Sequence, residues 1–403
     1  MSLLEQYFEN KIFLNMKTKL KSGQYSDYYC NFRNLLVCPK LMDDTANLII
    51  ETIKNNNIEF DALCGVLTGG VPITAIVANK LGVKQILVRE KVKEYGMKNE
   101  IDGHLEPGSR VLVIEDVVTT GNSVLEVIHK LRKNNFVVSD TIVLMERTSE
   151  SRKNIESHNI YLNSLMNVKH LEPFINSFKG KITKIINEKK TALCLSLDIF
   201  DNWTRAVELL DEVGPYICMV KTHQDITTGF QPSIIMALAK KHNFLIMEDR
   251  KIVDVPKIAT RQLEEIDTWA HCVTVMVNNY KDIKDHYSNP NNIELIGVCE
   301  MNTLNSFPLI DSGDPLPENL FTIINQSKYK KHPELLRITP GVVEEEEDIK
   351  DKGRYRTIEQ AMCFDKNDIV IIGSNILNDP FPIEKTKSCA SLSWYFFNTN
   401  NSK

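Results

Sequence analysis

Two runs of the sequence combine acids, cations, hydroxyls and glycines at spacings that could do chemistry. The first is VLVIEDVVTTGNSV at 111–124, where a hydrophobic run is followed by Glu115 and Asp116 and then by a small-residue turn into a helical pattern. Backbone N–H groups at such a helix start can hold a phosphate, and hydroxyls can add donors. The two acids suit a ribose diol or a bridging Mg²⁺ instead. The turn residues are Thr119, Thr120, Gly121, Asn122 and Ser123.

The second run is LIMEDRKIVDVPK at 245–257, which carries acids and a lysine in alternation. Asp249 and Lys251 are two residues apart, so both can point the same way on extended backbone. With Asp254 and the earlier Lys221, they predict a Lys–Asp array that neutralises its own charge and can therefore be buried. A carboxylate beside a substrate carboxylate would favour loss of CO₂, and Lys251 could protonate the resulting carbanion. Such a site requires no metal, pyridoxal or thiamine.

The composition is that of an ordinary folded protein. The chain has 403 residues, of which 25% are charged and 42% hydrophobic, and this length predicts about two to three domains. The net charge of −5 gives no support for a nucleic-acid partner. This net charge is still compatible with a local basic pocket that binds a small anion.

Cysteine usage and the N-terminus predict a cytoplasmic protein. The nine cysteines are odd in number and form no CxxC pair, which favours buried free thiols in a reducing compartment over disulfides or zinc. Glu5 and Glu9 stand where a signal peptide would be apolar. Because no run approaches the ~18 apolar residues of a membrane helix, we expect no membrane contact.

The first part of the chain is expected to fold as a doubly wound, mostly parallel α/β sheet. Apolar strand-like runs alternate there with helical patterns. The runs are residues 60–67, 85–90, 110–116 and 140–147. Ligands bind such sheets at the carboxyl ends of strands, and Glu115 and Asp116 are expected to cap the carboxyl end of the third run.

A second architecture is expected after a polar, Lys-rich stretch from about Ser149 to Lys190, in which we place the joint. Eight apolar runs separated by helix-sized segments follow, and they predict a (β/α)8 TIM barrel. They are residues 192–198, 216–221, 244–249, 273–277, 293–299, 320–325, 335–340 and 368–373. The predicted divisions are a first domain of 1–165, a joint of 166–190 and a barrel of 191–403.

The run at 111–124 resembles the phosphoribosyl-pyrophosphate motif of type I phosphoribosyltransferases. Four further segments, LKSG (20–23), GVLTGGVP (65–72), VREKVKEYGMK (88–98) and MERTSE (145–150), occur in the order seen in orotate phosphoribosyltransferases. The resemblance implies that family's fold, Mg²⁺ as cofactor, and orotate and phosphoribosyl pyrophosphate as substrates. It also implies that Lys21 and Arg147 lie near the orotate and pyrophosphate ends of the site, with Tyr28 and Tyr29 close by. Pyrophosphate would be held through the backbone of Thr68, Gly69 and Gly70.

The resemblance further implies a mobile catalytic loop. Its cations would be Arg89, Lys91, Lys93 and Lys98, with Lys93 as the catalytic residue. The family usually has Lys directly after the loop Arg, and this chain has Glu90 there, so we expect Lys91 to serve instead. Cations on a closing loop stabilise the charge of departing pyrophosphate more in the transition state than in the ground state.

Three segments of the second half resemble orotidine 5′-phosphate decarboxylase, in that family's order. They are SLDI (196–199), KTHQDI (221–226) and EDRKIVD (248–254). The resemblance implies orotidine 5′-phosphate as substrate, no cofactor, and a homodimer in which one subunit supplies Asp254 to its partner. Ser196 and Asp198 would bind the ribose and base region. The catalytic array would be Lys221, Asp249, Lys251 and Asp254.

Several positions depart from the decarboxylase pattern. Asn302 can still hydrogen-bond a pyrimidine, but Ile258 replaces a threonine near the ribose. In the phosphate loop, Gly373 and Ser374 stand where the family has Gly-Arg, and serine cannot replace the bidentate charge-assisted grip of an arginine. Candidate substitute cations are Lys257, Lys281 and Arg354.

Two interpretations therefore stay open. The first is a bifunctional enzyme that makes uridine 5′-monophosphate from orotate. The second is an active transferase joined to a weak or inactive barrel with a structural or dimerising role. A third, a nucleotide sensor without catalysis, is disfavoured by the cations at 89–98, because a sensor needs none for leaving pyrophosphate.

Overall fold

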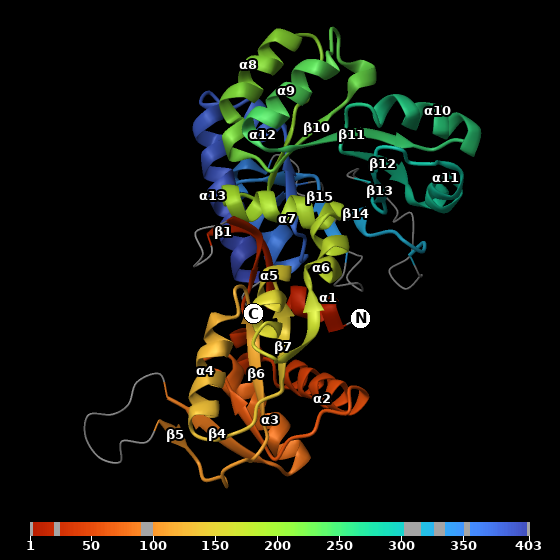
Figure 1. Cartoon of the computed structure of the whole chain (residues 1–403). Coiled ribbons are helices and arrows are strands. Elements are labelled where there is room, and N and C mark those ends of the chain that lie inside the picture. The colour runs from red at the N-terminus through yellow and green to blue at the C-terminus, as the bar shows by residue number, and fades with distance from the viewer. Residues whose placement is uncertain are drawn as a thin grey trace. The chain divides into compact units, whose positions relative to one another are not determined.

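The computed structural model describes residues 3–19, 25–89, 100–301, 316–325, 335–349 and 355–400, and it divides into two compact units (Figure 1). The first unit is Met1–Asn176 and the second is Ser177–Lys403. Each unit buries hydrophobic clusters of its own. Each therefore has the anatomy of an independent domain.

A six-stranded sheet forms the centre of the first unit. Its order is β5-β4-β3-β6-β7-β8, and its neighbours are parallel except for β4 and β5. The strands are β3 (Ala62–Gly65), β4 (Lys84–Val88), β5 (Ile101–Asp102), β6 (Val111–Val118), β7 (Asp140–Glu146) and β8 (Tyr161–Asn167). The order changes direction between β3 and β6, so a ligand is expected in the crevice outside their carboxyl ends.

Alternate residues along these strands pack on opposite faces of the sheet. Leu112 and Ile114 share one core with the first three helices, whereas Val111 and Val113 share the other with α4 and α5. The helices are α1 (Leu3–Glu9), α2 (Pro39–Asn55), α3 (Gly70–Leu81), α4 (Asn122–Lys133), α5 (Ser149–Glu156) and α6 (Val168–Ile175), with the 3-10 helix η1 (Phe32–Val37). A separate antiparallel pair is formed by β1 (Phe13–Lys19) and β2 (Tyr25–Cys30).

The second unit contains a closed parallel barrel. Each of the eight predicted apolar runs supplies one strand, in the order β10-β11-β12-β13-β14-β15-β18-β9. The strands are β9 (Leu193–Ser196), β10 (Met219–Thr222), β11 (Leu245–Ile252), β12 (Cys272–Met276), β13 (Glu294–Val298), β14 (Thr322–Ile324), β15 (Leu336–Thr339) and β18 (Ile369–Ile372). The predicted fold class, a doubly wound sheet followed by a TIM barrel, is confirmed.

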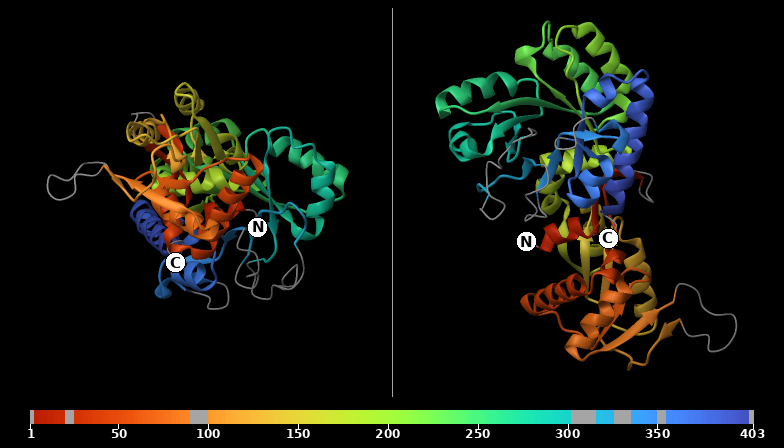
Figure 2. Two further views of the ribbon diagram at one scale, coloured as in Figure 1. Left: turned by 60° about the horizontal axis from the view of Figure 1, so that its bottom comes forward. Right: turned by 180° about the vertical axis from the view of Figure 1, so that it is seen from behind.

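Helices surround the barrel, and the C-terminal helix α13 packs over β9 and β18 beside α8 (Figure 2). The helices are α7 (Phe178–Lys189), α8 (Trp203–Val213), α9 (Pro232–His242), α10 (Pro256–Ile266), α11 (Tyr280–His286), α12 (Ser374–Leu377) and α13 (Pro382–Asn400). Shorter elements are η2 (Gly214–Tyr216), η3 (Gln224–Ile226), η4 (Val277–Asn279), η5 (Glu346–Asp348), the π-helix η6 (Gln360–Phe364), and the pair β16 (Val342–Val343) and β17 (Arg356–Thr357). Within the described ranges, none of the helices has the length and apolar character needed to cross a bilayer.

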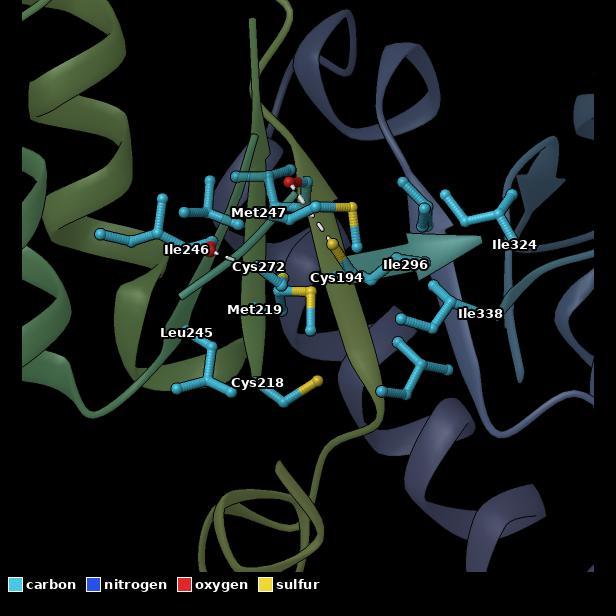
Figure 3. Close-up of a cluster of buried hydrophobic side chains, with 14 of the residues drawn as sticks. Cys194, Cys218, Met219, Leu245, Ile246, Met247, Cys272, Ile296, Ile324 and Ile338 are labelled. Atoms are coloured by element: carbon cyan, nitrogen blue, oxygen red, sulfur yellow. Dashed lines mark hydrogen bonds between the residues drawn. The ribbon is translucent and has the colours of Figure 1, made fainter. Parts of the chain in front are cut away.

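Sulfur-containing and branched side chains fill part of the barrel core (Figure 3). Cys194, Met219, Met247 and Cys272 come from four different strands and are completely buried. Burial raises the pKa of the Cys194 thiol well above its usual value, so that thiol stays neutral. All nine cysteines of the chain are free thiols.

One expectation about the first sheet needs correction. The strand expected at 110–116 continues to Val118, so Glu115 and Asp116 lie inside β6 and do not cap its end. The extension occurs because Val117 and Val118 pair with Met145 and Glu146 of β7. In addition, β8 lies within the polar stretch that was expected to form the joint, and it pairs along its length with β7.

Candidate functional site

The phosphate-loop turn at 119–123 lies between the end of β6 and the start of α4. Gly121 adopts a φ of 82°, and a Cβ there would come within 2.8 Å of the Ile155 side chain. Both the backbone conformation and the lack of space therefore require glycine at this position. No side chain caps the first turn of α4. Because the first N–H groups of a helix lack intrahelical partners, this start is suited to an anion.

Two side chains near α5 fix the shape of this turn, and neither was predicted from the sequence. Thr148 Oγ1 donates to the Thr119 carbonyl oxygen at 2.6 Å, and Asn154 Nδ2 donates to the Thr120 carbonyl oxygen at 2.7 Å. The two bonds engage the carbonyl side of the turn. No local sequence pattern indicates these two hydrogen bonds, because the bonded residues are 29 and 34 positions apart.

The predicted pyrophosphate turn, Thr68–Gly70, packs directly on the acid-bearing part of β6. A Cβ on Gly69 would lie 2.0 Å from Asp116 Oδ2, and a Cβ on Gly70 would lie 2.4 Å from the carbonyl oxygen of Ile114. The structure therefore brings the diglycine turn and the acids together at the crevice between β3 and β6. Only glycine permits this approach.

The two acids form an oxygen-rich edge. Glu115 is buried, and its Oε1 accepts from the Asp116 N–H at 3.0 Å, while Asp116 Oδ1 accepts from the Val117 N–H at 2.7 Å. Such hard oxygen donors fit Mg²⁺. In the described part of the chain no three His, Cys, Asp or Glu residues gather into a cage. The pair of carboxylates, Glu115 and Asp116, suits Mg²⁺, which usually takes one or two carboxylates together with phosphate oxygens and water.

Arg147 at the end of β7 meets the β2 strand. Its Nη2 donates to Ser26 Oγ and to the Tyr28 carbonyl oxygen, both at 2.8 Å. Its guanidinium carbon lies 4.8 Å from the centre of the Tyr28 ring, within the range of a cation–π contact. Burial raises the pKa of Tyr28, and Arg147 opposes that shift. Tyr29 is half-buried and pairs with Leu14 of β1.

Arg89 directly follows β4, at the base of the predicted loop. It makes a two-pronged ion pair with Asp102, at 2.8 Å from Nε and 2.6 Å from Nη2, and its carbonyl oxygen accepts from Lys130 Nζ at 3.0 Å. The remaining predicted loop cations and the first predicted lysine lie outside the described residues. They are Lys21, Lys91, Lys93 and Lys98.

The predicted Lys–Asp array of the second unit comes together at the barrel strand ends. Lys251 Nζ lies 2.7 Å from Asp249 Oδ2. Lys221 Nζ lies 3.3 Å from Asp249 Oδ2 and 3.3 Å from Asp198 Oδ1. The four side chains thus form a row, Asp198, Lys221, Asp249 and Lys251, in which every neighbouring pair has opposite charges. Such pairing is what permits buried charge.

The array keeps its central carboxylate ionised. Burial alone would raise the pKa of Asp249, but the attraction of Lys221 and Lys251 outweighs burial and holds the pKa at about 2. Asp249 is 8% exposed. An ionised acid is therefore present in a nearly dry position at neutral pH.

His223 belongs to the same cluster, although the sequence analysis did not select it. Its Nε2 lies 2.8 Å from Lys221 Nζ and 3.6 Å from Asp249 Oδ2. Burial lowers the pKa of His223, and the Lys221 charge lowers it further. Because a lysine ammonium can only donate, Nε2 of the neutral imidazole is the acceptor. The spacing of His223 two residues after Lys221, in a strand-like run, could have revealed it.

The local geometry of Lys251 differs from the expectation. The pairing of β11 with β12 shifts between Glu248 and Ile252, and Lys251 has a φ of 50°. Asp249 and Lys251 therefore meet across a β-bulge and not on extended backbone, because a bulge re-aims side chains. Thr274 supports this shape: its Oγ1 accepts from the Lys251 N–H at 2.8 Å and donates to Asp249 Oδ1 at 2.9 Å.

Asp254 does not join the array within one chain. It is exposed, and its carboxylate accepts from the following N–H, that of Val255, at 2.7 Å. Three exposed apolar residues surround it in sequence: Val253 and Val255 at 62% and Ile258 at 45% exposure.

The remaining predicted barrel residues lie around the ends of β9 and β18. Ser196 Oγ donates to Asp198 Oδ2 at 2.9 Å, and a Cβ on Gly373 would lie 2.9 Å from the Ser196 Cβ. Ser374 begins α12 and is exposed. Asn302 and the candidate cation Arg354 fall outside the described residues.

An acidic cluster lies next to Ser374. Lys385 Nζ is 2.7 Å from Glu344 Oε2 and 3.0 Å from Asp348 Oδ2, and Asn375 Oδ1 accepts from the Glu344 N–H at 3.2 Å. Lys385 is thus already paired. The two predicted candidates for a phosphate grip that lie within the described residues are exposed, Lys257 on α10 and Lys281 on α11.

Comparisons with known proteins match both units. The model of the Orotidine 5'-phosphate decarboxylase / HUMPS family matches residues 191–389, and that of the Phosphoribosyl transferase domain matches residues 32–172. A uridine 5'-monophosphate synthase of Bos taurus is 26% identical over 93% of this chain and 92% of its own length. The chain belongs to the uridine 5'-monophosphate synthase family.

Within this family, the first unit is an orotate phosphoribosyltransferase domain and the second an orotidine 5'-phosphate decarboxylase domain. The orotate phosphoribosyltransferase of Methanocaldococcus jannaschii is 34% identical, and the match covers 38% of this chain and 85% of that protein. A solved orotate phosphoribosyltransferase from Aeropyrum pernix is 26% identical, with a TM-score of 0.39 over 44% of this chain and 100% of that one.

Proposed function

We propose that this chain converts orotate into uridine 5′-monophosphate with the two sites described above. The observation that carries the proposal is the half-buried alternation of Asp198, Lys221, Asp249 and Lys251 in the barrel, together with the phosphate turn next to two acids in the first unit. Each arrangement suits one step. The first transfers ribose 5-phosphate to orotate, and the second removes CO₂.

In the transferase step, the backbone of 119–123 holds the 5-phosphate at the start of α4, and Thr68–Gly70 holds pyrophosphate. Glu115 and Asp116 would bind the ribose hydroxyls and hold Mg²⁺, and a bound Mg²⁺ would neutralise charge on the leaving pyrophosphate. Arg147 and Tyr28 hold orotate from the β2 side. Lys21, Arg89, Lys91, Lys93 and Lys98 are the proposed further contacts, with Lys93 stabilising the departing group.

In the decarboxylase step, Ser196 and Asp198 bind the ribose and base region, and Asp249 faces the substrate carboxylate. The bond between the ring carbon and the carboxylate breaks, CO₂ leaves, and the electron pair stays on the ring carbon. The Lys251 ammonium then transfers a proton to that carbon, and the neutral amine regains a proton from water. Lys221 and His223 keep Asp249 in place throughout.

We also propose a homodimer, and the exposure of Asp254 supports it. This acid is in none of the ion pairs of the array, and it is exposed beside the exposed apolar residues Val253, Val255 and Ile258. We propose that these apolar residues pack against a second copy, which brings Asp254 into its partner's site. Burial of such side chains supplies the association energy.

The second candidate, a weak barrel, is favoured by one observation. The residue that follows Gly373 is an exposed serine, and nearby Lys385 is already paired with two acids. In a decarboxylase that acts on orotidine 5′-phosphate, binding of the substrate's phosphate group contributes to stabilising the transition state. A weak grip would slow CO₂ loss while leaving the transferase intact.

A separate assay of the decarboxylase half tests the second step of the proposal. Purified chain is given orotidine 5′-phosphate alone, and CO₂ release is compared with that of Lys251→Ala and of Lys240→Ala, a control at an exposed position of α9. Release by wild type and Lys240→Ala, lost in Lys251→Ala, is the expected result. Equal, negligible release by all three would favour the weak barrel.

The division of the chain and its location are also proposals. The proposed transferase residues all fall within 1–165 and the proposed decarboxylase residues within 191–403, which supports a joint at 166–190. A cytoplasmic location is supported by nine free thiols, which a reducing compartment preserves.

A further inference from the structure

Glu248 is a fully buried carboxylate immediately before Asp249 in β11. Successive side chains of a strand point to opposite faces, so Glu248 projects away from the array that Asp249 joins. Neither proposed reaction uses it. A buried acid is costly unless it is well bonded, so its contacts indicate what it does.

The Glu248 side chain holds the end of β10. Oε1 and Oε2 each lie 3.1 Å from the backbone N of Gln224, and Oε2 accepts from Thr222 Oγ1 at 3.0 Å. Thr222 and Glu248 are direct neighbours in the pairing of β10 with β11. Gln224 begins η3, which has no side-chain cap of its own, so Glu248 supplies the missing acceptor from the adjacent strand.

The two residues held by Glu248 flank His223 on both sides. Fixing Thr222 and Gln224 fixes the backbone between them, and His223 projects from it toward Lys221 Nζ at 2.8 Å. We propose that Glu248 is a positioning residue that orients His223, and through it Lys221, for the decarboxylase step. This inference rests on the proposed role of the array.

Burial of Glu248 makes this clamp sensitive to pH. Burial raises the pKa of Glu248 to about 7. The hydrogen bonds from the Gln224 N–H and the Thr222 hydroxyl lower this pKa and so oppose burial. Of the nearby charges, Asp225 raises the pKa and Arg250 lowers it. Asp225 and Arg250 pair with each other at 3.1 Å, and Gln224 Nε2 donates to Glu265 at 3.0 Å. The ionised carboxylate accepts all its bonds, so the clamp is complete above about pH 7 and weaker below it.

Glu294 of β13 provides a matched control. It too is a nearly buried acid with a raised pKa that accepts from a threonine of the next strand, Thr322, at 2.8 Å. It has no contact with the array. Glu248→Ala and Glu294→Ala should therefore destabilise the barrel alike, while only Glu248→Ala should lower kcat for orotidine 5′-phosphate, by roughly tenfold to a hundredfold. Equal kcat losses in the two variants would overturn the inference.

Two further readouts separate positioning from stability and from the wider proposal. Because the clamp weakens below about pH 7, the kcat of the wild type should decline there. Glu248→Gln keeps one acceptor for the Gln224 N–H and does not titrate, so we expect it to retain kcat and to show no such decline. The NMR titration of the His223 imidazole needs no turnover: its pKa should shift in Glu248→Ala and stay unchanged in Glu294→Ala. An unshifted His223 in a folded Glu248→Ala variant would overturn the inference even if wild type proved inactive as a decarboxylase.

Discussion

At the residue scale, Gly69 leaves no room for a side chain, because a Cβ there would lie 2.0 Å from Asp116 Oδ2. Its φ of −72° suits any residue, so substitution by alanine tests the contact alone. We predict that Gly69→Ala displaces Asp116 and lowers transferase kcat/KM roughly a hundredfold, because misplacement by about 1 Å can cost that much. Steady-state assay with orotate measures it.

The decarboxylase half of the same molecule is the internal control for Gly69→Ala. Its rate with orotidine 5′-phosphate should be unchanged, since the substitution lies in the other unit. A variant that folds and keeps full transferase activity would show that the acids and the diglycine turn do not form one site.

His223 gives a prediction about pH. Burial and Lys221 lower its pKa below the usual ~6.5 of the unfolded chain. Between those two pKa values the unfolded chain binds more protons, so the contribution of neutral His223 is complete above about pH 6.5 and declines as pH falls. Thermal midpoints from pH 7.5 to 5.5 should therefore fall more steeply for wild type than for His223→Asn. Parallel curves would contradict this.

At the element scale, the bulge of β11 depends on Thr274 of β12. Thr274→Val preserves shape but removes the acceptor of the Lys251 N–H and a donor to Asp249. We predict a loss of stability of about 1–3 kcal/mol, from the buried group left without a partner. Decarboxylase kcat should fall more than KM rises, because Lys251 is re-aimed. Denaturant titration and steady-state kinetics measure the two effects, and an unchanged kcat would refute the role given to the bulge.

How far the sequence predicts these elements depends on where their contacts come from. The barrel strands could be predicted because strands buried on both faces read as continuous apolar runs, as in ALCLSLD and DIVIIG. Strand β8, with the sequence YLNSLMN, could not, since its asparagines and serine resemble a loop. The bulge at Lys251 also escaped prediction, because it depends on pairing with β12.

Site residues follow the same rule. The Lys–Asp array and the diglycine turn could be identified because their members lie close together in short runs. Thr148, Asn154 and Thr274 escaped because each acts on a distant segment, and single hydroxyl or amide residues leave no pattern. His223 shares a run with Lys221 and was within reach of sequence reasoning.

At the scale of the whole molecule, the exposed Asp254 predicts complementation between subunits. Asp254→Ala and Lys251→Ala should each be inactive as decarboxylases. Mixed after mild dissociation, they should recover about a quarter of wild-type activity, because half of the random dimers then contain one intact site of two. Activity of the mixture equal to that of the separate variants would contradict a shared site.

The central claim is that one chain carries out both steps. Purified protein is incubated with orotate, phosphoribosyl pyrophosphate and Mg²⁺, in parallel with Lys251→Ala, and the products are separated by chromatography. We predict uridine 5′-monophosphate from wild type and orotidine 5′-phosphate from Lys251→Ala. Orotidine 5′-phosphate accumulating equally in both samples would contradict a catalytic barrel.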